Sequence, residues 1–248
     1  MAGACPQVQA RRGAVVTAAE LDILAFGAHP DDVEIGMAGT IAKQIEAGSR
    51  VGICDLTQAE MSSNGTVELR QQEAAAASAV LGLSARSTLA LPDRGLDGSP
   101  QQLAAVTAEI RKHRPRIVFA PYWKDRHPDH VACSALIEQA VFNAKLRRYL
   151  PSLAPVTVEQ LIFYYINDVE SVGLMVDVSE QYEQKRQALR CYRSQFDSAA
   201  AGEDRVATPL TGAYVDNVEA RDRLLGAQRG WTFAEGFAVK RPHPIHLF

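Results

Sequence analysis

The sequence predicts an α/β protein, a single-domain three-layer αβα sandwich with a mostly parallel, Rossmann-like sheet. Up to about residue 150, short apolar runs alternate with amphipathic stretches, a βαβα rhythm typical of a parallel sheet covered by helices on both faces. The 248 residues, 47% of them hydrophobic, suit one large domain. No internal repeat or linker-like tract divides the chain. We therefore expect one domain over residues 21–248, preceded by a flexible leader over residues 1–20.

The first strands and helices are predicted from apolar periodicity. Residues 21–26 form a short apolar run suited to a buried strand. The apolar stripe over residues 35–45 then predicts a helix that ends at Gly48, because glycine commonly follows the last helical turn. The other strands expected before residue 150 are residues 51–56, 87–91 and 116–120.

Capping residues predict where the next helices begin. Thr66 is the expected N-cap of a helix near residues 68–81. Ser99 followed by Pro100 has the usual order of an N-cap and a first helical turn. A further helix is expected after the loop at residues 122–130.

The pattern changes after about residue 150. Ser179 is the expected N-cap of a helix with an apolar and aromatic face. The side chains expected on that face are Tyr182, Leu189, Tyr192 and Phe196. The remaining elements are predicted as strands at residues 161–166, 174–178 and 233–239 and a helix near residues 217–228.

Composition excludes several classes of function. The chain has 26 Lys and Arg against 29 Asp and Glu, and this net charge of −3 argues against a nucleic-acid-binding surface. No apolar run approaches the roughly 18–20 residues that a membrane span requires. No apolar block follows Arg12 in residues 1–20, so we expect no signal peptide. The four cysteines are far apart, and Cys54 and Cys133 lie in apolar segments, which predicts buried thiols and a cytoplasmic protein.

Two short segments combine histidine with aspartate: His29-Pro30-Asp31-Asp32 and His127-Pro128-Asp129-His130. Each follows a predicted strand, and ligands of open parallel sheets bind beyond the carboxyl ends of the strands. A lone histidine is usually a surface or core residue, but two such segments at two strand ends favour a shared site. Imidazole and carboxylate together suit zinc, and a catalytic zinc keeps about three protein ligands.

Three histidines and three aspartates exceed the needs of one metal ion. The surplus would supply a base and an oxyanion stabiliser for hydrolysis. A competing interpretation makes the pair Asp31 and Asp32 a helix N-cap and a first-turn acid, which is compatible with ligation. Spacing alone assigns no roles, and Fe²⁺ accepts the same ligand types as Zn²⁺. A Rossmann nucleotide site is excluded, because no GxGxxG follows the first strand.

The run from Ala28 to Gly36, with residues 127–130 downstream, resembles the zinc-dependent N-acetylglucosamine deacetylases of the LmbE-like (PIG-L) family. The likeness extends from about Leu21 to Lys240 and is closest to the bacillithiol-pathway branch, which acts on N-acetylglucosaminyl-malate. The other matching stretches are Asp55-Leu56-Thr57, Glu60-Met61, Asn64-Gly65-Thr66, Glu68, Arg70, Phe163-Tyr164-Tyr165-Ile166-Asn167, Tyr192-Arg193-Ser194-Gln195-Phe196 and Thr208-Pro209-Leu210-Thr211-Gly212.

The resemblance implies a Zn²⁺ site and the catalytic groups around it. The implied zinc ligands are His29, Asp32 and His130. Asp31 matches the general base, and a protonated His127 would stabilise the oxyanion. Asp129 matches the carboxylate that orients the second histidine segment. Acetate and a free glucosamine amine would be the products.

The resemblance also implies a substrate pocket. Arg70 matches a substrate-binding arginine that could hold a malate carboxylate by paired hydrogen bonds. Arg126 and Asn64 are expected to line the same pocket, and Tyr214 is the candidate for a mobile tyrosine beside the oxyanion.

Three hypotheses about function follow. The first is deacetylation of N-acetylglucosaminyl-malate. The second is deacetylation of another N-acetylglucosamine conjugate, a chito-oligosaccharide or a thiol conjugate. The third is a non-catalytic sugar- or metal-binding relative. The expected partners are a small-molecule N-acetylglucosaminide and, by the resemblance, other copies of the chain in a homo-oligomer such as a hexamer.

Overall fold

The computed structural model describes residues 20–197 and 205–242, and its strands form one sheet in the order β3-β2-β1-β4-β5-β7-β6. The strands are β1 (Ile23–Gly27), β2 (Val51–Asp55), β3 (Ala85–Thr88), β4 (Ile117–Pro121), β5 (Gln160–Tyr164), β6 (Leu174–Asp177) and β7 (Ala234–Ala238). The strands β1 to β5 pair in parallel, and β7 is antiparallel to both β5 and β6. The mostly parallel sheet expected from the sequence is confirmed. The leader expected over residues 1–20 lies, except for Glu20, outside the described residues.

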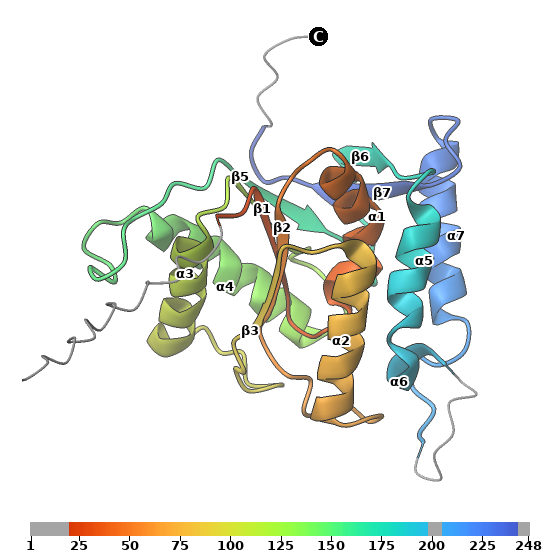
Figure 1. The fold of residues 1–248 in the computed structure, drawn as a ribbon, viewed down its shortest axis with the longest axis horizontal. Helices are drawn as coiled ribbons and strands as arrows, with labels where there is room; N and C mark the ends of the chain where they lie inside the picture. Colours follow the sequence, from red (N-terminus) through yellow and green to blue (C-terminus); the bar gives the residue numbers. More distant parts are fainter. Residues whose placement is uncertain (1–19, 198–204, 243–248) are drawn as a thin grey trace, which may run out of the picture.

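Helices cover both faces of this sheet (Figure 1). They are α1 (Asp32–Glu46), α2 (Val67–Leu81), α3 (Pro100–His113), α4 (Pro128–Ala144), α5 (Tyr182–Arg190), α6 (Arg193–Phe196) and α7 (Tyr214–Ala227). Side chains alternate between the faces of a strand, so Ile23 of β1 packs with α1 and α2, whereas Leu24 packs with α3 and α4. The three-layer αβα sandwich is therefore confirmed.

Three predicted boundaries differ from the structure because tertiary contacts decide them. β3 begins earlier than expected, at Ala85, because residues 85–88 pair with β2, and Ala90 leaves the sheet with a φ of 51°. α4 begins at Pro128, inside the loop expected at residues 122–130, and α7 begins at Tyr214 rather than near residue 217. Thr66 and Ser99 cap α2 and α3 as predicted, by accepting hydrogen bonds from backbone N–H groups.

The helix expected to be capped by Ser179 is different in two respects. Gln181 occupies the N-cap position of α5, and Ser179 Oγ instead donates to Asp177 Oδ1 and accepts from the N–H of Phe233. Ser179 therefore joins the strands β6 and β7 rather than starting a helix. The aromatic face is also divided between two helices, because α5 ends at Arg190 and the short helix α6 follows it.

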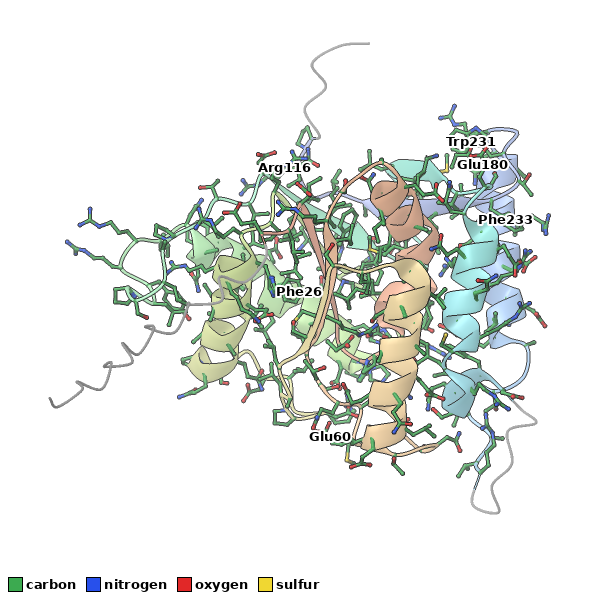
Figure 2. All side chains as sticks on the ribbon, viewed as in Figure 1. Phe26, Glu60, Arg116, Glu180, Trp231 and Phe233 are labelled. Atoms are coloured by element: carbon green, nitrogen blue, oxygen red, sulfur yellow. The ribbon has the colours of Figure 1, made fainter. Side chains whose placement is uncertain are left out.

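The carboxyl ends of the parallel strands lie together at one edge of the sheet. Figure 2 labels Arg116, directly before β4, at the top of the molecule and Glu60, in the loop after β2, at the bottom. β1 and β4 are neighbours, but β1 connects to β2 on one side while β4 leads on to β5 on the other, which makes their junction a topological switch point. In the part of the chain that the structure describes, no helix is long and apolar enough to cross a membrane.

Candidate active site

A cavity of about 440 Å³ opens beyond the carboxyl ends of β1 and β4. Both histidine segments reach it, because one follows β1 and the other follows β4. The residues predicted for the site that line it are His29, Asp31, Asp32, Arg70, Arg126, His127, His130 and Tyr214. The expected convergence of the two segments on one crevice is therefore seen.

The three histidines form a compact cluster in this cavity. His29, His127 and His130 each present a ring nitrogen, and these atoms lie within 4.8 Å of one another. Asp32 lies between two of them: its Oδ1 is 3.1 Å from Nε2 of His130, and its Oδ2 is 3.5 Å from Nδ1 of His29. The carboxylate of Asp32 is fixed by the backbone N–H of His29, which donates to Oδ2 at 2.9 Å.

His130 is oriented from behind by Asp125. Nδ1 of His130 lies 3.0 Å from Asp125 Oδ1, a close ion pair rather than a well-aligned hydrogen bond. Asp125 is held in turn by the side-chain amide of Asn167, which donates at 2.9 Å. This arrangement leaves Nε2 of His130 to bind a metal, in the carboxylate–histidine pattern usual for metal ligands. Asp125 did not emerge from the sequence, although it lies only two residues before His127.

His29 has its own carboxylate partners. Its Nε2 is 3.3 Å from Asp93 Oδ1 and 3.5 Å from Asp129 Oδ2, so Nδ1 is the nitrogen that faces Asp32. Arg94 holds Asp129 through its backbone N–H and its guanidinium. The implied role of Asp129 therefore needs a correction: its carboxylate lies against the first histidine segment rather than the second. Asp93, from the loop after β3, was not predicted.

His127 differs from the other two histidines in its hydrogen bonding. It is the N-cap of α4, and its Nδ1 accepts the backbone N–H of Asp129 at 3.2 Å. A neutral ring with an accepting Nδ1 carries its proton on Nε2, where it can donate a hydrogen bond but cannot bind a metal. Burial lowers the pKa of His127, and positive charge on His130 and His29 lowers it further. The hydrogen bond on Nδ1 and the lowered pKa favour a neutral His127 with its proton on Nε2, whereas a protonated His127 was expected from the sequence.

The charges around the cluster suit a divalent cation. Burial opposes protonation of His130, but the carboxylates of Asp32 and Asp125 outweigh it and raise its pKa to about 9. Asp32, Asp129 and Asp93 likewise raise the pKa of His29 against the effect of burial. Carboxylates that stabilise protons on two facing imidazoles would also stabilise a metal ion that replaces those protons. The donor set of two imidazoles and one carboxylate fits Zn²⁺ or Fe²⁺.

Asp31 is held in a strained conformation at the base of the cavity. Its φ of 122° lies in a region that non-glycine residues rarely adopt, and such strain is found mostly at functional sites. It occupies the N-cap position of α1, but its side chain makes no capping bond and instead pairs with Arg70 Nη1 at 3.1 Å. Burial raises the pKa of Asp31 to about 7, partly offset by Arg70. Asp31 therefore occupies the N-cap position that the competing interpretation expects, but its side chain does not cap the helix.

Two residues expected to contact the substrate form hydrogen bonds with other groups of the protein instead. Arg70 lines the cavity, but its guanidinium is buried and also donates to the carbonyl of Pro30 and to Ser62 Oγ. Asn64 is a correction: it is not among the described residues that line the cavity, and its amide exchanges two hydrogen bonds with the backbone of Val206. Both residues shape the pocket from behind.

Arg126 and Tyr214 do face the cavity. Arg126 is exposed at its mouth, and its guanidinium makes no hydrogen bond or ion pair with any residue that the structure describes. Tyr214, at the start of α7, donates its hydroxyl to Asn167 Oδ1 at 3.0 Å. The same Asn167 holds Asp125, so Tyr214 is connected to His130 through two side chains.

An open α/β sheet with a histidine and aspartate cluster at its switch point indicates an enzyme with a metal site there. Residues 24–141 match the family model PIG-L, described as GlcNAc-PI de-N-acetylase. The chain is 30% identical over 189 residues to the diacetylchitobiose deacetylase of Thermococcus kodakarensis, covering 70% of each chain. It is 26% identical over 251 residues to a 1D-myo-inositol 2-acetamido-2-deoxy-alpha-D-glucopyranoside deacetylase of a Mycobacterium species, covering 77% of this chain and 80% of the relative.

A solved structure extends the similarity to the whole fold. The conserved protein TT1542 from Thermus thermophilus superposes with a TM-score of 0.83 at 39% identity, covering 91% of this chain and 97% of TT1542. The chain therefore belongs to the PIG-L family of N-acetylglucosamine deacetylases, which are metal-dependent, and is itself a deacetylase that hydrolyses an amide bond.

Proposed function

We propose that this protein removes the acetyl group from the N-acetylglucosamine unit of N-acetylglucosaminyl-malate. One observation carries the choice of substrate: the guanidinium of Arg126, unpaired among the described residues, stands at the mouth of the cavity whose floor holds the histidine cluster. A sugar acetamide that reaches the floor would leave its aglycone near the mouth. A carboxylate on that aglycone would form charge-assisted hydrogen bonds with Arg126, whereas a neutral sugar would offer only hydroxyl groups, which accept weaker hydrogen bonds.

His29 through Nδ1, Asp32 and His130 through Nε2 would hold the metal, which we propose to be Zn²⁺, with Fe²⁺ as the alternative in the cell. A bound ion of this kind lowers the pKa of a water molecule to about 7 and polarises a carbonyl oxygen. The ligand set is supported by the carboxylates behind both rings, which leave those nitrogens free to bind.

The remaining chemistry falls to Asp31 and His127. Asp31 accepts a proton from the attacking water, a task suited to a group whose pKa is raised to about 7. His127 donates its Nε2–H to the oxygen that becomes negative during attack. When the C–N bond breaks, the proton on Asp31 passes to the leaving nitrogen. One water and one acetamide thereby give acetate and a free amine.

Other N-acetylglucosamine conjugates are the second candidate. Two relatives are named for a chitobiose and for an inositol glycoside, and neither of these carries a carboxylate aglycone. A cavity adapted to them would make no use of the charge on Arg126. Identifying the substrate therefore requires the deacetylation rates of several N-acetylglucosamine conjugates to be compared, because activity on one compound is not sufficient.

Replacing Arg126 with alanine is expected to reduce selectivity for the malate conjugate. The wild-type protein should deacetylate N-acetylglucosaminyl-malate with a kcat/KM well above that for free N-acetylglucosamine. Loss of a charge-assisted hydrogen bond costs about 1.5–3 kcal/mol, so Arg126→Ala should reduce that ratio by roughly tenfold to a hundredfold. Acetate release is measured with both compounds, and also with diacetylchitobiose and the inositol glycoside. The ratios of kcat/KM are then compared between the wild type and the variant.

Arg116→Ala is the matched control, because Arg116 pairs with Glu159 at the opposite edge of the sheet (Figure 2). It should leave the ratio unchanged. Equal wild-type rates on the malate conjugate and on free N-acetylglucosamine would refute the malate proposal while leaving the deacetylase assignment intact.

A further inference from the structure

The helix that carries Asp32 is interrupted one turn after its start. Within α1, Met37 has a φ of −153° and a ψ of 21°, so the helix is kinked there. The first turn, residues 32–36, contributes Asp32 and Ile35 to the cavity, and the second part begins beyond the kink. A kink breaks the backbone ladder and leaves N–H and C=O groups that need other partners.

Charged side chains from distant elements bond to both sides of this kink. Glu235 of β7 accepts the N–H of Gly39 at 3.0 Å and the N–H of Thr40 at 2.6 Å. Arg221 of α7 donates to the C=O of Ile35 at 3.0 Å through Nη2. One side of the kink is thus held by an anion and the other by a cation.

Ion pairs connect these two charged side chains, Glu235 and Arg221, through the protein interior. Nζ of Lys185 lies 2.7 Å from Glu235 Oε1 and 2.7 Å from Asp222 Oδ2. Asp222 Oδ1 accepts from Nε of Arg221 at 2.9 Å. We call these four residues, Lys185, Asp222, Glu235 and Arg221, the buried charge cluster. Its two cations and two anions balance, and the side chains of all but Arg221 are fully buried.

Arg221 connects the buried charge cluster to the wall of the active-site cavity. Besides Ile35, its guanidinium donates to the carbonyl of Ile166 at 2.9 Å, just beyond the end of β5. Ile35 and Ile166 both line the cavity. A buried ion network is rarely the most stabilising solution for a core, because desolvation offsets much of the attraction between the charges. Its bonds, however, are directional, and here they end on the backbone that places Asp32.

We propose that Arg221 is a positioning residue for the metal centre, holding the first turn of α1 at the distance from β5 at which Asp32 can reach the ion together with His29 and His130. This inference rests on the proposed metal role of Asp32. Among the described residues, Arg221 makes no hydrogen bond with the metal ligands themselves, and its effect passes through the backbone of residues 32–36.

The variant Arg221→Lys tests the proposal, because it keeps a cation beside Asp222 but lacks the planar fork that reaches both carbonyls. Zn²⁺ affinity of the metal-depleted protein, measured against a chromophoric chelator, should fall by about tenfold or more, as for other residues that orient metal ligands. In the metal-free protein, amide hydrogens of residues 32–40 should exchange faster than in the wild type. With Zn²⁺ at saturation, KM should change less than kcat.

Arg186→Lys is the matched control. Arg186 joins α5 to α7 through a two-bond ion pair with Glu219, as Lys185 does through Asp222, but within the described residues Arg186 makes no hydrogen bond with α1. It should leave both Zn²⁺ affinity and exchange over residues 32–40 unchanged. Wild-type values for Arg221→Lys in both measurements would overturn the inference, and so would equal losses in the two variants. If the wild-type protein binds no Zn²⁺, the proposed function fails, and the exchange measurement still decides whether Arg221 holds the first turn of α1.

Discussion

Replacing Asp31 with asparagine is expected to lower kcat by about 10²–10⁴ while leaving the metal in place. Asparagine keeps the size of the side chain and can still accept the hydrogen bond from Arg70, but it cannot take a proton from water. Steady-state acetate release together with elemental analysis of the purified variant separates the two effects.

Asp216→Asn provides the comparison, because Asp216 is exposed in the first turn of α7 and is not among the described residues that line the cavity. Its turnover should equal that of the wild type. If Asp31→Asn also turns over at the wild-type rate with its metal bound, another group is the base.

His29→Ala and His130→Ala are each expected to lose most of the bound metal, whereas His127→Ala should keep it. The reason is the tautomer: His29 and His130 have one nitrogen facing a carboxylate partner and the other facing Asp32, but His127 uses Nδ1 as an acceptor. His127→Ala should instead lose a factor of about 10²–10³ in kcat, the usual cost of one oxyanion donor.

Metal content per chain, by elemental analysis of all three variants, is the measurement. Loss of metal from His127→Ala to the same extent as from His29→Ala would place His127 among the ligands. Retention of metal in His29→Ala would remove His29 from them.

Much of the fold could be predicted because the deciding signals are local. The apolar runs that become β1, β2 and β4 and the caps Thr66 and Ser99 depend on neighbours in sequence. Ser179 shows the limit: its hydroxyl found partners at Asp177 and Phe233, and the second of these is distant in sequence. A capping residue is predictable only where no tertiary partner competes for its side chain.

The residues of the site also differ in whether local sequence could predict them. The two histidine segments were predicted because each is contiguous and follows a strand. Asp93 and Asp125 were not, since an isolated aspartate in a loop gives no sign of the imidazole that it will face. Arg70 was assigned to substrate by the family resemblance, whereas the structure shows its guanidinium bonded to Asp31, Pro30 and Ser62. The hexamer and the cytoplasmic location expected from the sequence stay predictions.

The central claim is that the histidine and aspartate centre hydrolyses the acetamide of N-acetylglucosaminyl-malate with the help of one metal ion. Acetate release from this compound, followed before and after metal removal by a chelator and again after addition of Zn²⁺, tests it most directly. We predict that release stops in the metal-free protein and returns when a single equivalent of Zn²⁺ per chain is added. Undiminished release from protein shown by elemental analysis to be metal-free would contradict the account.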